Sequence, residues 1–525
     1  MRHRLAAVAL VFTIGLMLTG TASAQSSQSS QLTQLTPTAP PPQVRRLTVD
    51  EAVRAALESN LGVQVARVDP MIQDLSVALA RTAWSPRFNS TLQTTSSDTP
   101  NNSFLSGALG TKTSDARFLT NAGISQVLPW GGDYSVGWDG TRSTTTNLFS
   151  NFSPQLRSSL SLNYRQPLLR GFSIDANRQQ LLVSQKNREI ADVTLRQAIT
   201  ATSRAVRNAY WDLAYAIASL DVQRQSLALA ETSLRNTRAR VEIGTTPPID
   251  VVEAEAEVAT RAEAVIIAEA QIETGQDTLR ALLYDPSAAG FWTTRIEPAE
   301  LPPFQAAPVD VDAATRMALE RRTDLQETRK NLEATDINLR FFRNQALPDV
   351  TASFDYGLTG LGGTQFVRGA GFPGPIIGES QRGFGSVLRD LFANDFPSWT
   401  ATLNVSYPLG SSQPQANLAR ARLQYTQGQT QLRNQELQVV TQVRAAGRQV
   451  QTNQKRVETT RTSRQLAERR LDAEERKFAA GTSTTFFVFQ AQRDLALARN
   501  NELRSVLDYN RSIVDFESVQ EAPLR

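Results

Sequence analysis

Residues 213–279 read LAYAIASLDVQRQSLALAETSLRNTRARVEIGTTPPIDVVEAEAEVATRAEAVIIAEAQIETGQDTL. Apolar side chains recur in this segment every seven residues, at Leu213, Leu220, Leu227, Leu234 and Val241 and then at Val251, Val258, Val265, Ile272 and Leu279. A seven-residue repeat is typical of helices that supercoil around one another. Gly244 separates the two runs, and glycine is common where a helix ends. The segment therefore predicts two long helices joined by a tight turn.

A similar segment lies near the C-terminus, where the same seven-residue spacing gives Val443, Val450 and Val457, is interrupted by Arg464, and resumes at Leu471 and Phe478 before Gly481. Other landmarks also occur twice and in the same order. The matched pairs are Asp50 with Asp312, Pro86 with Pro348, Pro167 with Pro408 and Gly244 with Gly481. Asp50 lies at a predicted helix start, because Thr48 and Glu51 on either side of it have the spacing of a capping box. Asp312 lies at the corresponding place in the second half. We interpret the chain as a duplication of one unit: helix, strands, long helix, long helix.

This duplication divides the chain into a first repeat at 47–308 and a second at 309–525. In the first repeat we expect strands at about 87–166 and a helical hairpin at about 174–284. In the second we expect strands at about 349–408 and a hairpin at about 413–517. A single helix from Ala176 to Glu242 would be about 100 Å long. Such a helix suits a spacer that crosses a wide compartment.

Alternating polar and apolar residues mark the strand regions, for example Leu156, Leu160, Leu162 and Tyr164 with polar neighbours between them. Strands of this length suit a β-barrel in a membrane, where a tilted strand needs about 9–11 residues. Trp130, Tyr134, Trp138, Tyr164, Trp399 and Tyr407 lie near the predicted strand ends, as in an aromatic girdle. A soluble β-sandwich is the alternative, but it leaves the long helices unexplained.

The N-terminus has the pattern of an export signal. Arg2 and Arg4 precede an apolar run from Leu5 to Leu18, and a small-residue cleavage site ends at Ala24. We therefore predict a signal peptide at 1–24. The segment 25–46, rich in Ser, Thr, Gln and Pro, is predicted to be a disordered leader.

Composition argues against catalysis and metal binding. The 525 residues include no cysteine, and the single histidine, His3, lies in the predicted signal peptide. The mature chain therefore lacks the usual zinc ligands and the usual general base. The glutamates between Glu253 and Glu269 are expected to form a solvated helix face. We predict no enzyme, no cofactor, no metal and no nucleic-acid partner.

The sequence resembles the TolC-like outer membrane efflux protein family from about Leu47 to Phe516. The resemblance rests on QPLL at 166–169 and on the hairpins RVEIG…IDVVEAEAE, from Arg240, and RKFAAGTS…VFQAQRDLALARNNEL, from Arg476. It implies an α+β membrane protein, in which a trimeric β-barrel is continuous with a coiled-coil α-helical barrel. It also implies a location in the outer membrane, with helices in the periplasm. The implied partners are outer-membrane lipid, a periplasmic adaptor and an inner-membrane pump.

The strand region of the first half departs from the family pattern of two strands per half. The interval from Pro86 to Pro167 exceeds the interval from Pro348 to Pro408 by about one hairpin, which we assign to residues 116–144. If this hairpin joins the barrel, a trimer has 18 strands. If it lies over the outer face or forms a loop, the trimer has 12. The Gly-rich segment from Gly369 to Gly378 is expected to be an extracellular loop.

Two sets of residues are candidates for function. Several family members close the periplasmic end with acidic residues soon after the second tip glycine. Here these positions hold Phe487 and Gln490, with Phe486 and Phe489 beside them, while Asp250 and Glu253 stand in the first repeat. We predict a gate of phenylalanine flanked by carboxylates, and the alternative is that these rings only pack between helices. The resemblance further implies adaptor docking at Ile243, Gly244, Thr245, Ala480, Gly481 and Thr482.

The favoured function is a passive outer-membrane exit duct for efflux or type I secretion. A periplasmic coiled-coil adaptor or interaction protein without a pore is the alternative, and a hydrolytic enzyme ranks third. Alternating strands in both halves favour the duct, because a barrel needs strands. The two helical hairpins also favour it, because an adaptor would have only one. The absence of His and Cys from the mature chain also argues against a metal-selective lining.

Overall fold

A computed structural model describes residues 44–103, 107, 110–287, 291–300, 304–306 and 308–521. The predicted signal peptide, and the predicted leader up to Gln43, lie outside the described residues. The leader was predicted to extend to Arg46, but strand β1 already begins at Val44. It pairs in parallel with β6, so these backbone groups find partners that a disordered leader would lack.

In the described part of the chain the helices are α1 (Val49–Ser59), α2 (Leu61–Arg81), α3 (Ala176–Glu242), α4 (Ile249–Leu283), α5 (Val311–Arg321), α6 (Thr323–Gln345), α7 (Phe384–Ala393), α8 (Gln413–Ala479) and α9 (Thr485–Gln520). The strands are β1 (Val44–Leu47), β2 (Arg87–Pro100), β3 (Lys112–Val127), β4 (Asp133–Thr145), β5 (Phe152–Pro167), β6 (Arg295–Pro298), β7 (Asp349–Arg368), β8 (Ile376–Arg382) and β9 (Pro397–Ser406). The protein is thus α+β and rich in helix.

The two halves have elements of matching size. Helices α3 and α8 each contain 67 residues, and α4 and α9 contain 35 and 36. Helices α1 and α5 each contain 11 residues. The capping box predicted at the start of α1 is confirmed, because Glu51 N donates to Thr48 Oγ1 and Thr48 N donates to the Glu51 carboxylate. Its counterpart α5 is capped by Asp310, whose carboxylate accepts from two backbone amides.

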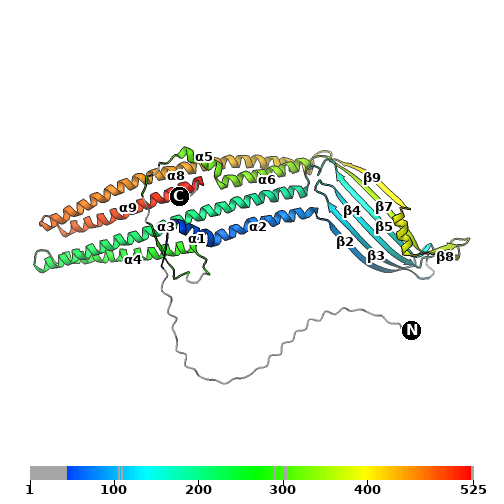
Figure 1. Cartoon of the computed structure of the whole chain (residues 1–525), viewed down its shortest axis with the longest axis horizontal. Coiled ribbons are helices and arrows are strands. Elements are labelled where there is room, and N and C mark those ends of the chain that lie inside the picture. Colours follow the sequence, from blue (N-terminus) through cyan, green and yellow to red (C-terminus); the bar gives the residue numbers. More distant parts are fainter. Residues whose placement is uncertain are drawn as a thin grey trace, which may run out of the picture. The chain divides into compact units, whose positions relative to one another are not determined.

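Helices α2, α3, α6 and α8 lie side by side in that order and lead into one antiparallel sheet (Figure 1). Ion pairs join each neighbouring pair of helices. Arg188 of α3 contacts Asp74 of α2 at 2.7 Å, Lys186 of α3 contacts Glu333 of α6 at 2.9 Å, and Arg329 of α6 contacts Glu436 of α8 at 3.5 Å. The order of the helices follows the order of the strands to which they connect.

The α3–α6 contact holds four alternating charges. Lys186 contacts both Glu189 and Glu333, and Lys330 contacts Glu189 at 2.7 Å. The hydrogen bond from Lys330 lowers the pKa of the Glu189 carboxyl, and the hydrogen bond from Lys186 does the same for Glu333. These side chains are partly exposed, so each pair contributes about 1 kcal/mol or less to stability. Their clearer effect is to fix the register of the two helices.

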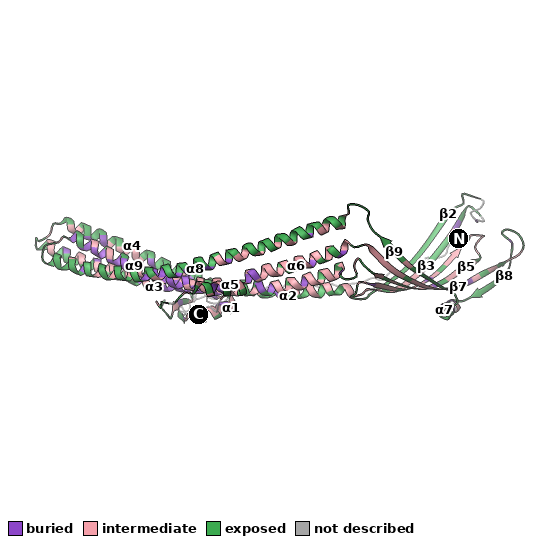
Figure 2. Cartoon of the chain, turned by 90° about the horizontal axis from the view of Figure 1, so that it is seen from above, coloured by how far each residue is buried: buried purple, intermediate pink, exposed green. Residues whose placement is uncertain are grey.

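Buried side chains concentrate in the helical part away from the sheet, where α3, α4 and α9 pack together (Figure 2). The largest core cluster surrounds Tyr210 of α3, which is fully buried. Its hydroxyl donates to the Leu47 carbonyl at 3.0 Å and accepts from Glu300 N at 3.2 Å. This ring therefore anchors the β1–β6 pair to the middle of the long helix α3. Burial also raises the pKa of the Tyr210 hydroxyl.

The main sheet has the strand order β2-β3-β4-β5-β7, and β7 continues to β9 along Asp349–Leu358 and to β8 along Gly363–Arg368. Strands β8 and β9 therefore share one edge, so this sheet of seven strands is six strands wide at any level. Residues 116–144 belong to β3 and β4, which pair with each other and with both flanking strands. The surplus hairpin thus lies within the sheet and not over its face.

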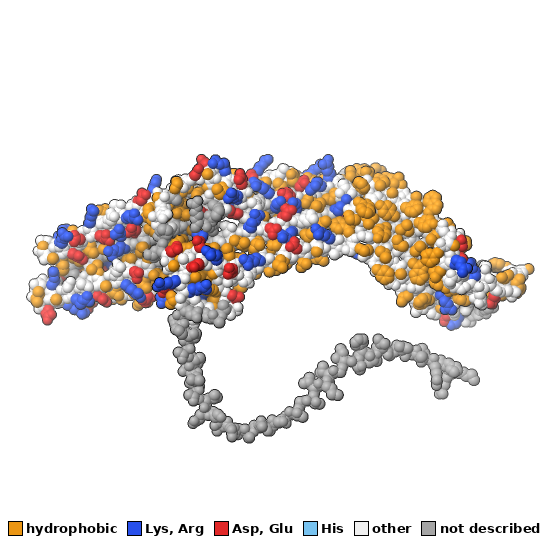
Figure 3. All heavy atoms as spheres, viewed as in Figure 1, with side chains coloured by type: hydrophobic (Ala, Val, Ile, Leu, Met, Phe, Trp, Pro, Cys, Tyr) orange, Lys and Arg blue, Asp and Glu red, His pale blue; other side chains and the backbone are white. Residues whose placement is uncertain are grey.

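The two faces of the sheet differ sharply in polarity. Register places Leu162 of β5 beside Val136 of β4 and Tyr356 of β7, and the same face carries Phe88, Leu92, Ile124, Trp138, Leu160, Phe354, Trp399 and Leu403. The opposite face carries mainly serine, threonine, asparagine and charged residues. Figure 3 shows hydrophobic side chains gathered over the sheet, whereas charged side chains spread over the helices.

Helix α7 covers part of the apolar face. Val387 is buried against two glycines of β7, since a Cβ on Gly362 would lie 2.5 Å from a Val387 methyl and one on Gly360 would meet the Val387 carbonyl. Arg382 holds the helix through an ion pair with Asp390 at 2.6 Å. The segment from Gly369 to Gly378, expected to be a loop, ends in β8 from Ile376 onward.

Candidate functional site

The two helical hairpins end in turns with the same geometry. Gly244 and Gly481 have φ values of +76° and +74°, in the left-handed region that favours glycine. At the first tip, Gly244 N donates to the Val241 carbonyl and Thr245 N donates to the Arg240 carbonyl. The second tip repeats both bonds, from Gly481 to Phe478 and from Thr482 to Lys477. This pattern is the Schellman motif, which satisfies the last carbonyls of a helix.

The six residues predicted for adaptor docking all lie on these turns and are exposed, namely Ile243, Gly244, Thr245, Ala480, Gly481 and Thr482. Ile243 is the most apolar of them and is 73% exposed. No atom lies within 4 Å of the position of a Cβ on either glycine, so the backbone angle alone requires glycine here. Both tips thus expose short turns whose backbone conformation is fixed by the glycine and by hydrogen bonds to the preceding helix.

The residues predicted for the gate lie at the starts of α4 and α9, which the structure brings together. Thr485 Oγ1 donates to the Asp250 carboxylate at 3.1 Å, so the first turns of the two helices are linked. Glu253 is exposed one turn further along α4, and Gln490 is partly exposed on α9. Sequence reasoning did not find the Thr485–Asp250 bond, because 235 residues separate its partners.

The three phenylalanines near this end differ in burial. Phe489 is buried, with only 3% of its surface exposed. Phe487 is 49% exposed and contacts Phe486 edge to face, with 5.6 Å between ring centroids. Exposed aromatic rings in the first turn of α9 are available to line an opening, which a buried ring is not.

Two contacts that the sequence did not reveal join the hairpins near their tips. The guanidinium of Arg240 lies over the ring of Phe478 at 4.2 Å, which is a cation–π contact between α3 and α8. Glu257 of α4 pairs with Arg261 at 2.6 Å and with Arg493 of α9 at 3.7 Å. The expectation of a solvated glutamate face was therefore wrong for Glu257, which is buried because it compensates arginines on two helices.

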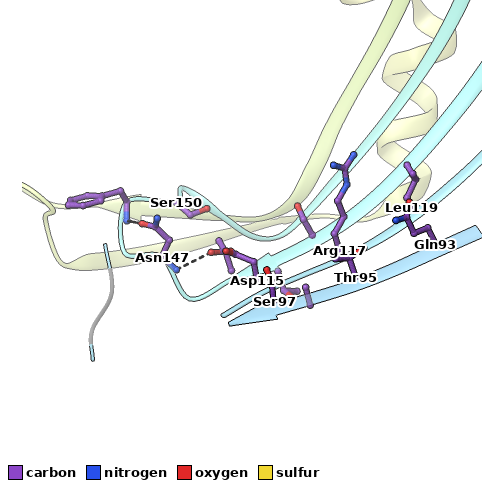
Figure 4. Close-up of a pocket in the computed structure, with 13 residues that line it drawn as sticks. Gln93, Thr95, Ser97, Asp115, Arg117, Leu119, Asn147 and Ser150 are labelled. Carbon is purple, nitrogen blue, oxygen red and sulfur yellow. Dashed lines mark hydrogen bonds between the residues drawn. The ribbon is translucent and has the colours of Figure 1, made fainter. Parts of the chain in front are cut away.

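The polar face of the sheet holds a cavity of about 680 Å³ near the strand ends far from the helices. Figure 4 shows Gln93, Arg117 and Thr95 on neighbouring strands, with the loop that carries Asn147 and Ser150 beside them. Asn147 shapes that loop by accepting a hydrogen bond from Phe149 N at 2.8 Å. A lining of hydroxyls, amides and both signs of charge suits a hydrated surface.

None of the described residues form a group of three or more His, Cys, Asp or Glu side chains that could hold a metal ion. None of the helices in the described part is both long and apolar enough to cross a membrane.

Comparison with known proteins gives a consistent result. A family model described as outer membrane efflux protein matches residues 52–283 and 314–515. No curated protein sequence matches the chain. Among solved structures, the CmeC outer membrane channel of Campylobacter jejuni is 14% identical, with a TM-score of 0.63 over 90% of this chain and 85% of that chain.

Two further structures are similar to the same extent. The outer membrane protein VceC of Vibrio cholerae is 15% identical, with a TM-score of 0.62 over 91% of this chain and 97% of that chain. The open MtrE outer membrane channel of Neisseria gonorrhoeae is 15% identical, with a TM-score of 0.59 over 91% of this chain and 89% of that chain. At such low identity these likenesses establish the fold.

Proposed function

Because the chain belongs to the outer membrane efflux protein family, we propose that three copies form one exit duct through the outer membrane and the periplasm. This membership confirms the resemblance predicted from the sequence. The duct is passive, serves efflux or type I secretion, and receives its substrate from an inner-membrane pump through a periplasmic adaptor.

The observation that carries this proposal is a sheet with one apolar face, one polar face and two open edges. Every residue of β2 is exposed, as is nearly every residue of β9 at the other edge. In a membrane such edges leave backbone groups without partners, so they must pair with further strands. Pairing β2 of one copy with β9 of the next closes a barrel, and six strands from each of three copies give 18. The polar faces then line the lumen.

The helices support the same assembly. Helix α2, at the edge of the helical layer, carries an exposed apolar stripe at Leu61, Val65, Val68, Ile72, Leu75 and Leu79, each 47–72% exposed. Its spacing alternates between three and four residues, which is the pattern of a coiled-coil seam. Helix α8 of a neighbouring copy would cover this stripe, because α8 lies at the other edge of the layer. The helical part would thus close into a tube below the barrel.

Single-particle imaging of the protein extracted from the outer-membrane fraction tests the duct directly. We expect a hollow particle with three-fold symmetry and a helical cylinder about 100 Å long, as 67-residue helices require. The strand count in the same particle distinguishes 18 strands from 12. A soluble rod without a membrane collar would contradict the duct and favour an interaction protein without a pore.

The gate belongs at the tip end of this tube. Three-fold repetition would place Phe487, Gln490, Asp250 and Glu253 in rings around the axis. Exposed phenylalanine rings at a narrow point exclude water and stop ions by dewetting, and the carboxylates would attract cations to the entrance. The support for this proposal is the exposure of Phe487 and the link from Asp250 to the same helix start.

Adaptor docking at the tips predicts a specific phenotype for Ile243→Glu. This change places a carboxylate on an exposed apolar residue next to the tip glycine, where a partner helix would otherwise pack. Cells producing the variant should become more susceptible to a panel of efflux substrates, while the variant reaches the outer membrane in normal amounts. Ile266→Glu is the matched control, because Ile266 is also exposed on the first hairpin but lies away from the tip. Equal susceptibility of both variants and wild type would argue against docking at Ile243.

A further inference from the structure

A second cavity, of about 530 Å³, lies where the helices meet the sheet. We call it the junction pocket. Its walls come from the first turns of α3, the last turns of α6 and the residues that precede α3. Because β5 ends just before this point and β7 begins just after it, the pocket lies at the level where the apolar face of the sheet gives way to the charged helices.

The junction pocket combines an apolar wall with guanidinium groups. Ile174, Leu181, Leu182 and Leu347 supply the apolar surface, and Leu347 is 43% exposed although it is a large aliphatic residue. The charged groups are Arg178, Arg340 and Arg343. This pairing of surfaces suits an amphipathic ligand with an anionic head.

The three arginines are not equivalent. Arg178 is fully engaged, since it contacts Asp175 at 2.9 Å and donates to the carbonyls of Gly171 and Ser173. Arg340 pairs with Asp336 at 3.1 Å. The guanidinium of Arg343 has no hydrogen bond or ion pair within the described ranges. The positive charge of Arg343 is therefore not balanced by a neighbouring carboxylate in this described part of the chain. An anion that entered the pocket would be attracted to it.

The packing of the neighbouring turn relates the pocket to the apolar face of the sheet. A Cβ on Gly131 would lie 2.8 Å from the Arg178 guanidinium, and one on Gly132 would lie 2.6 Å from the Gln166 side chain. Gln166 accepts a hydrogen bond from Tyr164 at 2.7 Å, and Tyr164 belongs to the apolar face. The turn at Gly131 and Gly132 thus connects the pocket wall at Arg178 with Tyr164 on the apolar face of the sheet.

We propose that the junction pocket binds a phospholipid of the inner leaflet of the outer membrane. Arg343 binds its phosphate, because a guanidinium matches two phosphate oxygens at once. The glycerol end and the first methylenes of an acyl chain lie against Leu181, Leu182 and Leu347, and the rest of the chain continues along the apolar strands. Basic pockets at the edge of membrane-spanning segments commonly hold lipid headgroups. The inference rests on the proposed function, which places this level of the molecule at the membrane surface.

Native mass spectrometry of the detergent-purified trimer tests the proposal, with dioleoyl phosphatidylglycerol as the probe. We expect binding of one lipid per chain by wild type and about tenfold weaker binding by Arg343→Gln, which loses a charged hydrogen bond. Arg343→Lys should recover part of the affinity, since it keeps the charge. Arg469→Gln is the matched control, because Arg469 is an exposed arginine of α8 remote from the pocket.

The outcomes separate this inference from the duct itself. Equal lipid binding by Arg343→Gln and wild type would overturn the pocket. Displacement of the lipid by millimolar inorganic phosphate would also overturn it, because a free anion would then be the preferred occupant. Arg343 is exposed, so the substitution should leave folding unchanged, and the same spectra report whether the trimer persists. A wild-type protein that is soluble and monomeric would instead contradict the proposed function.

Discussion

Outer membranes from cells that produce Leu162→Arg should contain almost no folded protein. Leu162 lies in β5, between β4 and β7. Its side chain is on the apolar face of the sheet, which we propose contacts lipid. An arginine on the lipid face near the bilayer midplane costs about 2–4 kcal/mol, and a trimer would bear this cost three times. The measurement is an immunoblot of the outer-membrane fraction, run with and without heating to separate folded trimer from unfolded chain.

Asn163→Arg is the control, because the neighbouring residue points to the opposite, polar face. This variant should assemble normally, since an arginine in a water-filled lumen keeps its hydration. The comparison is informative because Leu162 is already 38% exposed in the single chain. A soluble protein would tolerate both substitutions equally, so normal assembly of Leu162→Arg would exclude lipid contact at this face.

The second large effect is expected at the proposed gate. In planar bilayers, Phe487→Ala should raise the baseline conductance of the channel several-fold, because removal of the ring widens and hydrates the constriction. Leu497→Ala on the same helix is the control, since Leu497 is exposed to a similar extent but lies further from the tip. If both variants conduct like wild type, Phe487 has no part in closure and only fills space between helices.

Phe489→Ala should behave differently from Phe487→Ala. Phe489 is buried, so its truncation leaves a cavity and lowers stability by about 3–5 kcal/mol. Any conductance change in this variant would therefore come with a lower temperature of unfolding. Measuring both properties for both variants separates a residue that closes the pore from one that supports the helices.

The sequence was sufficient where local chemistry decides the structure. The capping box of Thr48 and Glu51 formed as predicted, because both partners lie within one helical turn. Gly244 and Gly481 end their helices as expected, because the left-handed backbone at a helix end favours glycine. Seven-residue spacing likewise identified long helices, since the supercoil depends on that period alone.

The sequence was insufficient where distant segments meet. The burial of Glu257 depends on Arg493, which lies on the other hairpin. Helix α7 could not be placed on the apolar face, because its position depends on Gly360 and Gly362 leaving room for Val387. The pairing of β1 with β6 also joins segments about 250 residues apart, and four residues of strand give no periodicity to detect.

The equal length of α3 and α8 restricts how this protein can change in evolution. Helices α3 and α8 both lead away from the main sheet and end at a hairpin turn. Their equal length places the two turns at the same distance from the sheet, so that together they form one end surface. A deletion of seven residues from α3 alone would keep its heptad register but shorten that hairpin by about 10 Å. The mismatch would break the Thr485–Asp250 and Arg240–Phe478 contacts together. A change in the distance that the chain spans therefore has to be made twice, once in each half of the gene, and by the same number of residues.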